Sequence, residues 1–296
     1  SQSRDENLTI TIKDQIEERL TSLFLSCLKA PSNETSGISM AVLGSGSGGN
    51  ATLVRCGATH VLVDAGLSAR QIVQRMATLG VEPGQLDGIL LTHEHGDHIN
   101  GVDVLLRTRD IPVYTNAMTR EVLRDQMKSE IRWVLFDSGQ EFKLGEFSIR
   151  TFKIPHDAVE PVGFVFIGEN VRLGMVTDVG YVTESIREEL RGSHGICIEA
   201  NYDQGLLERD TRRPWETKQR IVSRHGHLSN TETAGLLAEI ACERLNHVIL
   251  SHLSPDCNCP KLASETVRTQ LVEQGHVNVQ VQCARQDQPS EWVNIS

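Results

Sequence analysis

A run of six residues, HEHGDH at positions 93–98, limits most strongly what this chain can fold into and do. It follows the apolar, strand-like segment 88–92 and gathers three imidazoles and two carboxylates in very little chain. These side chains are ligand types that suit zinc, iron and manganese. Because only 11 of the 296 residues are histidine, the run favours a metal site, and a catalytic one, over a histidine-rich surface loop.

The spacing within the run directs four of its side chains to one point. His93 and His95 are two residues apart, so an extended backbone turns both to the same side. The glycine that follows permits a sharp turn. Asp97 and His98 then begin a helix, expected over residues 98–107, and point back to the same place.

The stretch ILLTHEHGDHINGV resembles the signature of the metallo-β-lactamase superfamily, and four further motifs stand in that family's order. HVLVDAGLS contains Asp64, FKIPHDA contains His156, RLGMVTDVG contains Asp178, and HVILSHLS contains His252. The resemblance covers roughly residues 38–280. It implies an α/β fold of four layers, αββα, in which two sheets lie between helices.

Details of the motifs are similar to one bacterial branch of that superfamily, the WalJ-type (YycJ-like) branch of nucleases. The matching stretches are GSGSGGNATLV, VDAGLSARQI, HDAVEPVGFVF, TDVGYVTE and GHLSNTETAGLLAE. The branch is related to ribonuclease Z and the phosphonate-pathway phosphodiesterase, whose extra histidine matches His227. One departure is Tyr202, where the branch is expected to have histidine between Asn and Asp.

The resemblance implies a site for two divalent metal ions, zinc or manganese, with iron as a third option. The residues expected to hold them are His93, His95 and His156 for the first, Asp97, His98 and His252 for the second, and Asp178 for both. Asp64 is expected to orient the ligand loop without contacting metal. His227 and Asp97 are the expected catalytic residues, His227 by protonating the leaving oxygen or holding a phosphate oxygen.

The chemistry of such a site suits phosphodiester hydrolysis. Because imidazole ligands are neutral, the two dications would keep surplus positive charge. This charge lowers the pKa of a bridging water and attracts anionic substrate oxygens. Two metals about 3.5–4 Å apart stabilise both the attacking and the leaving oxygen of an in-line displacement. The nucleophile is then a metal-bridging hydroxide.

The glycine-rich segment 44–50 has two readings. It is a hairpin turn between strands, or its Ser45, Ser47 and Asn50 line the rim of the substrate site, where glycine lets the backbone approach a ligand. Asn230, close to His227, is a fourth predicted substrate contact.

Periodicity predicts alternating strands and helices. The expected strands are 59–63, 88–91, 112–114, 147–154, 163–167, 172–176, 195–198 and 247–250, and the expected helices are 69–79, 117–127, 183–190 and 231–245. Ser229 and Glu232 form a capping box before the last of these helices.

Two segments differ in composition. Residues 38–296 are the expected metallo-β-lactamase-fold hydrolase domain, and residues 1–37 an N-terminal helical tail and linker. That tail is either a helix that folds back on the body (or an upstream remnant), or a docking or oligomerisation helix.

Charge and cysteine content bear on the partners and the cellular compartment of the protein. A net charge of −10 argues mildly against a nucleic-acid partner, but segment 209–224 contains six basic and two acidic residues around Trp215. That segment is either a solvated loop or a surface for a phosphate backbone and a stacked base. Seven cysteines without a CxxC pair, no long apolar run and no signal-peptide layout predict a cytoplasmic protein without a membrane span. A homo-oligomer is neither indicated nor excluded.

The first hypothesis is therefore a dinuclear phosphodiesterase acting on DNA or RNA, an exonuclease. The alternative enzyme is a hydrolase of a small ester, lactone, thioester or cyclic phosphodiester. A metal-stabilised interaction protein and a di-iron oxidoreductase are two further readings, disfavoured by the complete ligand set and by the lack of an electron-transfer domain.

Overall fold

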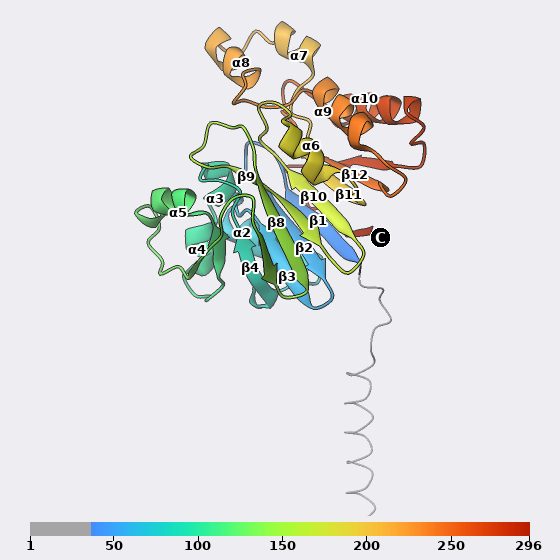
Figure 1. Cartoon of the computed structure of the whole chain (residues 1–296). Helices are drawn as coiled ribbons and strands as arrows, with labels where there is room; N and C mark the ends of the chain where they lie inside the picture. The colour runs from blue at the N-terminus through green and yellow to red at the C-terminus, as the bar shows by residue number, and fades with distance from the viewer. Residues whose placement is uncertain (1–36) are drawn as a thin grey trace, which may run out of the picture. The chain divides into compact units, whose positions relative to one another are not determined.

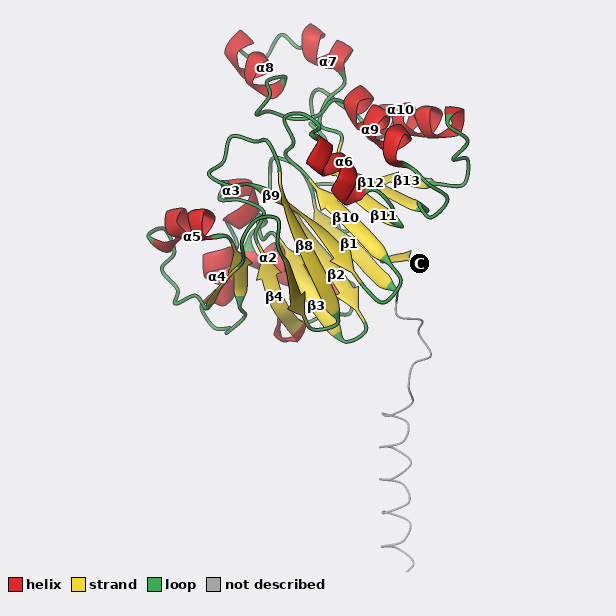
Figure 2. Cartoon of the chain, viewed as in Figure 1, coloured by secondary structure: helices red, strands yellow, loops and turns green. Residues whose placement is uncertain are grey.

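Two seven-stranded sheets form the centre of the protein in a computed structural model that describes residues 37–296 (Figures 1 and 2). The first sheet has the order β14 (Val293–Ile295), β1 (Ile38–Gly44), β2 (Ala51–Cys56), β3 (Thr59–Val63), β4 (Leu86–Leu90), β5 (Val113–Thr115) and β6 (Trp133–Leu135). The second has the order β13 (Gln280–Cys283), β12 (His247–Ser251), β11 (Gly195–Glu199), β10 (Arg172–Val176), β9 (Val162–Ile167), β8 (Phe147–Lys153) and β7 (Glu141–Leu144).

Helices pack on the outer face of each sheet. Those on the first sheet's side are α2 (Ala69–Thr78), α3 (Gly96–Ile99), α4 (Val102–Leu106) and α5 (Ala117–Arg124), and those on the second sheet are α6 (Glu184–Leu190), α9 (Asn230–Ile240) and α10 (Pro260–Glu273). Two short helices, α7 (Gln204–Arg209) and α8 (Trp215–Ile221), lie beyond the ends of the strands (Figure 1).

Strand side chains alternate between two apolar layers. In β3, Val61 and Val63 pack between the sheets, whereas Leu62 packs under the helices of its own side. In β9, Phe164 packs between the sheets and Val165 against the opposite helix layer. Because side chains alternate along a strand, a sheet buried on both faces needs apolar residues at consecutive positions. The expected αββα sandwich is confirmed.

The predicted elements are present with shifted ends, and one helix differs in kind. The helix expected over residues 98–107 is divided into α3 and α4, because the N–H of Gly101 donates to the carbonyl of Ala65 at 2.7 Å. The capping box of Ser229 and Glu232 is present, but α9 ends at Ile240, five residues before the predicted end.

Residues 1–36 lie outside the described part of the chain, and with them the predicted N-terminal helix and almost all of the tail and linker. Within residues 37–296, no helix has both the length and the apolar character that crossing a bilayer requires.

Candidate metal centre

The predicted metal ligands come from both sheets and meet at one edge of the sandwich. The run 93–98 follows β4 of the first sheet. His156, Asp178 and His252 follow β8, β10 and β12 of the second. These three strands run in the same direction, so their carboxyl ends lie along one edge.

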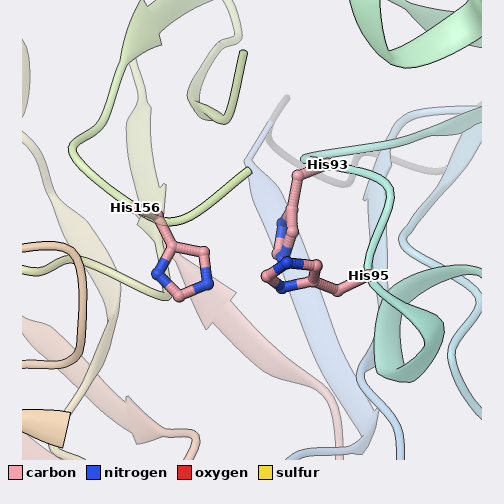
Figure 3. A group of neighbouring side chains, drawn as sticks. All are labelled: His93, His95 and His156. Atoms are coloured by element: carbon pink, nitrogen blue, oxygen red, sulfur yellow. The ribbon is translucent and has the colours of Figure 1, made fainter. Parts of the chain in front are cut away.

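Three histidines form one group of potential ligands. His93, His95 and His156 each offer a ring nitrogen, and these nitrogens lie within 4.8 Å of one another. Figure 3 shows the two rings from the loop after β4 facing His156 across the site. The ring centroids of His93 and His156 are 5.2 Å apart. The arrangement can hold one cation between three imidazoles.

A second group lies beside the first. Asp97, His98 and His252 also have donor atoms within 4.8 Å of one another. Oδ2 of Asp97 is 3.6 Å from Nε2 of His98 and 3.6 Å from Nε2 of His252.

Asp178 lies between the two groups. Its Oδ2 is 3.2 Å from Nε2 of His98 in the second group, and its Oδ1 is 3.9 Å from Nε2 of His156 in the first. The same Oδ1 is 3.3 Å from Nδ1 of His252. The carboxylate is buried, and its two oxygens face both groups, as a shared ligand requires.

The donor set fits divalent cations. Buried polar atoms in proteins nearly always have a hydrogen-bond partner. Within the described residues, Nε2 of His93, Oδ2 of Asp178 and Nε2 of His252 are buried and have none. His93 and His252 belong to the two groups, and Asp178 lies between them. Cations bound there would satisfy these atoms, and imidazole with carboxylate suits zinc, manganese and iron.

The protonation of the histidines follows from burial and charge. Burial holds the pKa of His93 well below its ordinary value and lowers that of His156, so both rings are neutral, as ligands must be. Burial also acts on His98, but Asp64 and Asp178 outweigh it and raise its pKa. Asp178, Asp97 and Glu199 likewise outweigh burial and raise the pKa of His252 to about 10.

Three site residues have left-handed backbone conformations. Asp64, Asp178 and His252 have φ values of 57°, 60° and 53°, and they are the only non-glycine residues with positive φ between residues 37 and 296. Such conformations cost free energy and occur mainly where the surrounding structure fixes them, often at functional sites. Each follows the end of a strand, at β3, β10 and β12.

Asp64 has the position predicted for an orienting residue. Its Oδ1 accepts the N–H of Thr92 at 2.9 Å, and its Oδ2 is 2.7 Å from Nδ1 of His98. This contact turns Nε2 of His98 toward Asp97 and Asp178.

Glu199 is a site residue that the sequence motifs did not predict. This residue ends β11 and is fully buried. Its carboxylate is 3.1 Å from Nδ1 of His227 and 3.5 Å from Nδ1 of His252. One signal was present in the sequence: in ICIEAN an acid ends an apolar, strand-like run, much as Asp64 and Asp178 follow apolar runs in their motifs.

The predicted substrate contacts have different surroundings. Ser47 lines the pocket above the metal groups. Ser45 is buried and accepts the N–H of His252 at 2.7 Å, and Asn50 is buried 3.2 Å from Nε2 of His98. Asn230 is buried and exchanges two hydrogen bonds with Asn258. These last three side chains brace the loops of the site.

The glycine-rich segment is a hairpin turn. It joins β1 and β2, which pair antiparallel. Gln286 holds its tip, accepting the N–H of Gly48 and donating to the carbonyl of Gly49, both at 2.9 Å. At the position where the sequence departs from the branch pattern, Tyr202 is buried against Leu207 and Cys257.

A pocket of about 230 Å³ opens over the two groups of potential ligands. Its lining residues are Ser47, His95, Asp97, His156, Asp157, Asp178, Thr217, Arg220, Ile221, His225, Gly226, His227 and His252. The pocket is therefore polar and charged, which fits an anionic substrate better than an apolar one.

An αββα sandwich with histidine and aspartate groups at its strand ends is characteristic of metal-dependent hydrolases of the metallo-β-lactamase fold. Residues 59–253 match the family described as Beta-lactamase superfamily domain, and the chain belongs to that family. It is a metal-dependent hydrolase.

Known relatives cover most of the chain. The sequence is 36% identical to Exodeoxyribonuclease YycJ of Bacillus anthracis over 244 residues, which is 81% of this chain and 91% of that protein. It is 35% identical to Exodeoxyribonuclease WalJ of Streptococcus pneumoniae over 80% of this chain and 89% of that one. The Zn(2+)-bound structure of PqqB from Methylobacterium extorquens has a similar fold, with a TM-score of 0.66 and 16% identity over 86% of this chain and 99% of PqqB.

Proposed function

We propose that the protein is a nuclease that hydrolyses phosphodiester bonds with two divalent cations. The favoured activity is that of an exonuclease acting on DNA. The relatives named exodeoxyribonucleases support the substrate class. The observation that carries the mechanism is the position of Asp178, whose two oxygens face two separate ligand groups. A single closed metal site would need only four donors.

Seven residues would hold the two cations. His93, His95 and His156 would hold one cation, Asp97, His98 and His252 the other, and Asp178 both. Bound there, the cations would supply an activated water and stabilise charge on phosphate oxygens.

His227 would act on the leaving group. It lines the pocket, and Glu199 engages its Nδ1 at 3.1 Å, which leaves Nε2 for the substrate. Protonated on both nitrogens, the ring would give its Nε2 proton to the departing sugar oxygen and keep the Nδ1 proton on the side of Glu199. Because Glu199 is buried and fixed, the ring keeps one orientation throughout the reaction.

The charged pocket supports the phosphodiester substrate over an ester or lactone. Asp157 and Arg220 form an ion pair at its wall, and Ile221 is the one hydrophobic side chain among its lining residues in the described part of the chain. A lactone or thioester hydrolase would need an apolar pocket for the acyl group.

The test uses the full chain loaded in turn with manganese, zinc and iron. Oligodeoxynucleotides labelled at the 5′ or the 3′ end, the matching RNA and a lactone panel are the substrates. We expect stepwise shortening of DNA, and a loss of at least about 100-fold in His93→Ala. His276→Ala, which removes a histidine outside the pocket, is the matched control. Equal turnover by wild type and His93→Ala, or hydrolysis of lactones alone, would overturn the proposal.

A further inference from the structure

One wall of the pocket is built by residues outside the predicted catalytic set. Helix α8 places Thr217, Arg220 and Ile221 along the pocket, and His225 follows from the next turn of chain. The spacing of three and four residues puts the helical side chains on one face. No residue of α8 is fully buried. Ile221 packs against the cluster of Tyr202, Leu207 and Cys257, but this contact does not explain why Thr217 and Arg220 face the pocket.

Arg220 is the one arginine or lysine among the pocket-lining residues within the described chain. Its Nε donates to Oδ2 of Asp157 at 2.8 Å, and its Nη2 donates to the same oxygen. The other oxygen of Asp157 is 3.2 Å from Nε2 of His156, a predicted metal ligand. The ion pair therefore connects α8 to the edge of the metal centre.

The guanidinium of Arg220 remains available to a ligand. An arginine has five N–H donors, and Asp157 engages two of its nitrogens from one side. The Arg220 side chain is 70% exposed. Planar guanidinium groups bind phosphate through paired hydrogen bonds. The free edge of Arg220 can therefore donate hydrogen bonds to a phosphate.

Other basic residues of this segment have structural partners. Arg213 donates to Asp210 at 2.7 Å and to Asp256 at 2.9 Å, and Arg212 donates to Asp256 at 2.7 Å. These pairs tie the α7–α8 segment to the loop before α10. They leave Arg220 as the cation that faces the reacting groups.

We infer that Arg220, with Thr217 and His225, binds a second phosphate of the substrate, one nucleotide away from the bond that is cut. The inference rests on the proposed function and adds a specificity determinant to it. Asp157 holds the guanidinium at the pocket until the phosphate arrives. A strand with two phosphates is thereby favoured over a diester with one.

The first test compares two substrates. Bis-p-nitrophenyl phosphate has one phosphate, whereas a single-stranded oligonucleotide has many. We expect Arg220→Ala to lower the ratio of kcat/KM for the oligonucleotide to that for the small diester by about 10- to 100-fold, mainly through KM. Arg220→Lys, which keeps the charge and loses the planar fork, should fall between.

Arg209→Ala is the matched control, because it removes the same charge from the same segment at an exposed position outside the pocket. We expect it to leave the ratio within about twofold of wild type. An unchanged ratio in Arg220→Ala, or an equal fall in Arg209→Ala, would overturn the inference.

A binding measurement keeps the inference separate from catalysis. Fluorescence anisotropy with a labelled oligonucleotide in EDTA needs no turnover. Arg220→Ala should weaken binding and reduce the slope of log K against log salt by about 0.7, the value for one phosphate contact on a single strand. If metal-loaded wild type hydrolyses neither substrate, the proposed function fails, and anisotropy still decides the role of Arg220.

The second phosphate could be an internal phosphate of the strand or its 5′-terminal phosphate. Oligonucleotides with and without a 5′-phosphate distinguish these two sources. An effect of Arg220→Ala on both 5′-phosphorylated and 5′-hydroxyl oligonucleotides supports an internal phosphate. An effect confined to the 5′-phosphorylated strand supports a terminal one. An effect on neither contradicts the inference.

Discussion

Nδ1 of His227 lies 3.1 Å from Oε2 of Glu199, a carboxylate with no exposed surface. The other oxygen, Oε1, accepts the N–H groups of Val179 at 2.5 Å and Leu228 at 3.1 Å. Burial alone would raise the pKa of Glu199, but His227 and His252 outweigh it and hold that pKa below its ordinary value. An ionised, fixed acceptor keeps the proton of His227 on Nδ1 and directs Nε2 to the pocket.

Glu199→Gln should lower kcat. The amide has the same shape but no charge, so it neither fixes the tautomer nor stabilises a positive ring. We expect kcat on bis-p-nitrophenyl phosphate to fall about 100-fold, a typical contribution of acid–base groups, with a smaller change in KM. Glu239→Gln, at a surface ion pair with Arg187, is the control. An unchanged kcat in Glu199→Gln would refute the role given to this pair.

Asp64→Asn should weaken metal binding while keeping the fold. Asparagine tolerates the left-handed backbone found at this position. It loses the negative charge that faces Nδ1 of His98. Loss of such a partner typically costs about 10- to 100-fold in metal affinity. Competition with a chromophoric chelator measures this loss, and an affinity equal to that of wild type would show that Asp64 has only a backbone role.

Gly66→Ala should destabilise the loop of metal ligands. A Cβ at Gly66 would lie 1.6 Å from the carbonyl oxygen of Asp97, a backbone atom that cannot rotate away. We expect a loss of about 3 kcal/mol in the free energy of unfolding, measured by urea denaturation. Gly84→Ala is the matched control, because its Cβ would meet nothing within 4 Å. Equal stability of the two variants would contradict this account of the loop.

Removal of metal should lower the thermal stability. A cation present at 100 times its Kd stabilises the folded state by about 2.7 kcal/mol. For a domain of this size, that corresponds to a fall in Tm of about 5–10 °C when a chelator is added. Differential scanning calorimetry of reconstituted protein checks this, with His93→Ala showing a smaller shift. If the chelator leaves the Tm of the wild type unchanged, the result would contradict cation binding by the two groups of potential ligands.

The metal motif was predictable because it is local. The run 93–98 carries four donors in one turn of chain, and its meaning depends little on distant packing. Helix α8 gives the opposite case. It has no buried residue, so it leaves no apolar period in the sequence, and only the structure places Arg220 at the pocket.

Two other features of the structure have tertiary causes. The break between α3 and α4 depends on a hydrogen bond from Gly101 to Ala65, which lies 36 positions earlier in the chain. Asn230 carries a polar side chain beside a predicted catalytic histidine, and its pairing with Asn258 could be seen only in the folded protein. Both depend on which segments the sandwich brings together.

The spread of the donors along the chain has a consequence for biosynthesis. The group of His93, His95 and His156 has been synthesised once about half of the polypeptide has been made, whereas His252 is the last of the predicted ligands along the chain. Under the proposed two-cation function, translation must therefore pass β12 before the second cation can bind. A cell short of these ions during synthesis would accumulate full-length, folded chains that lack metal and are therefore inactive.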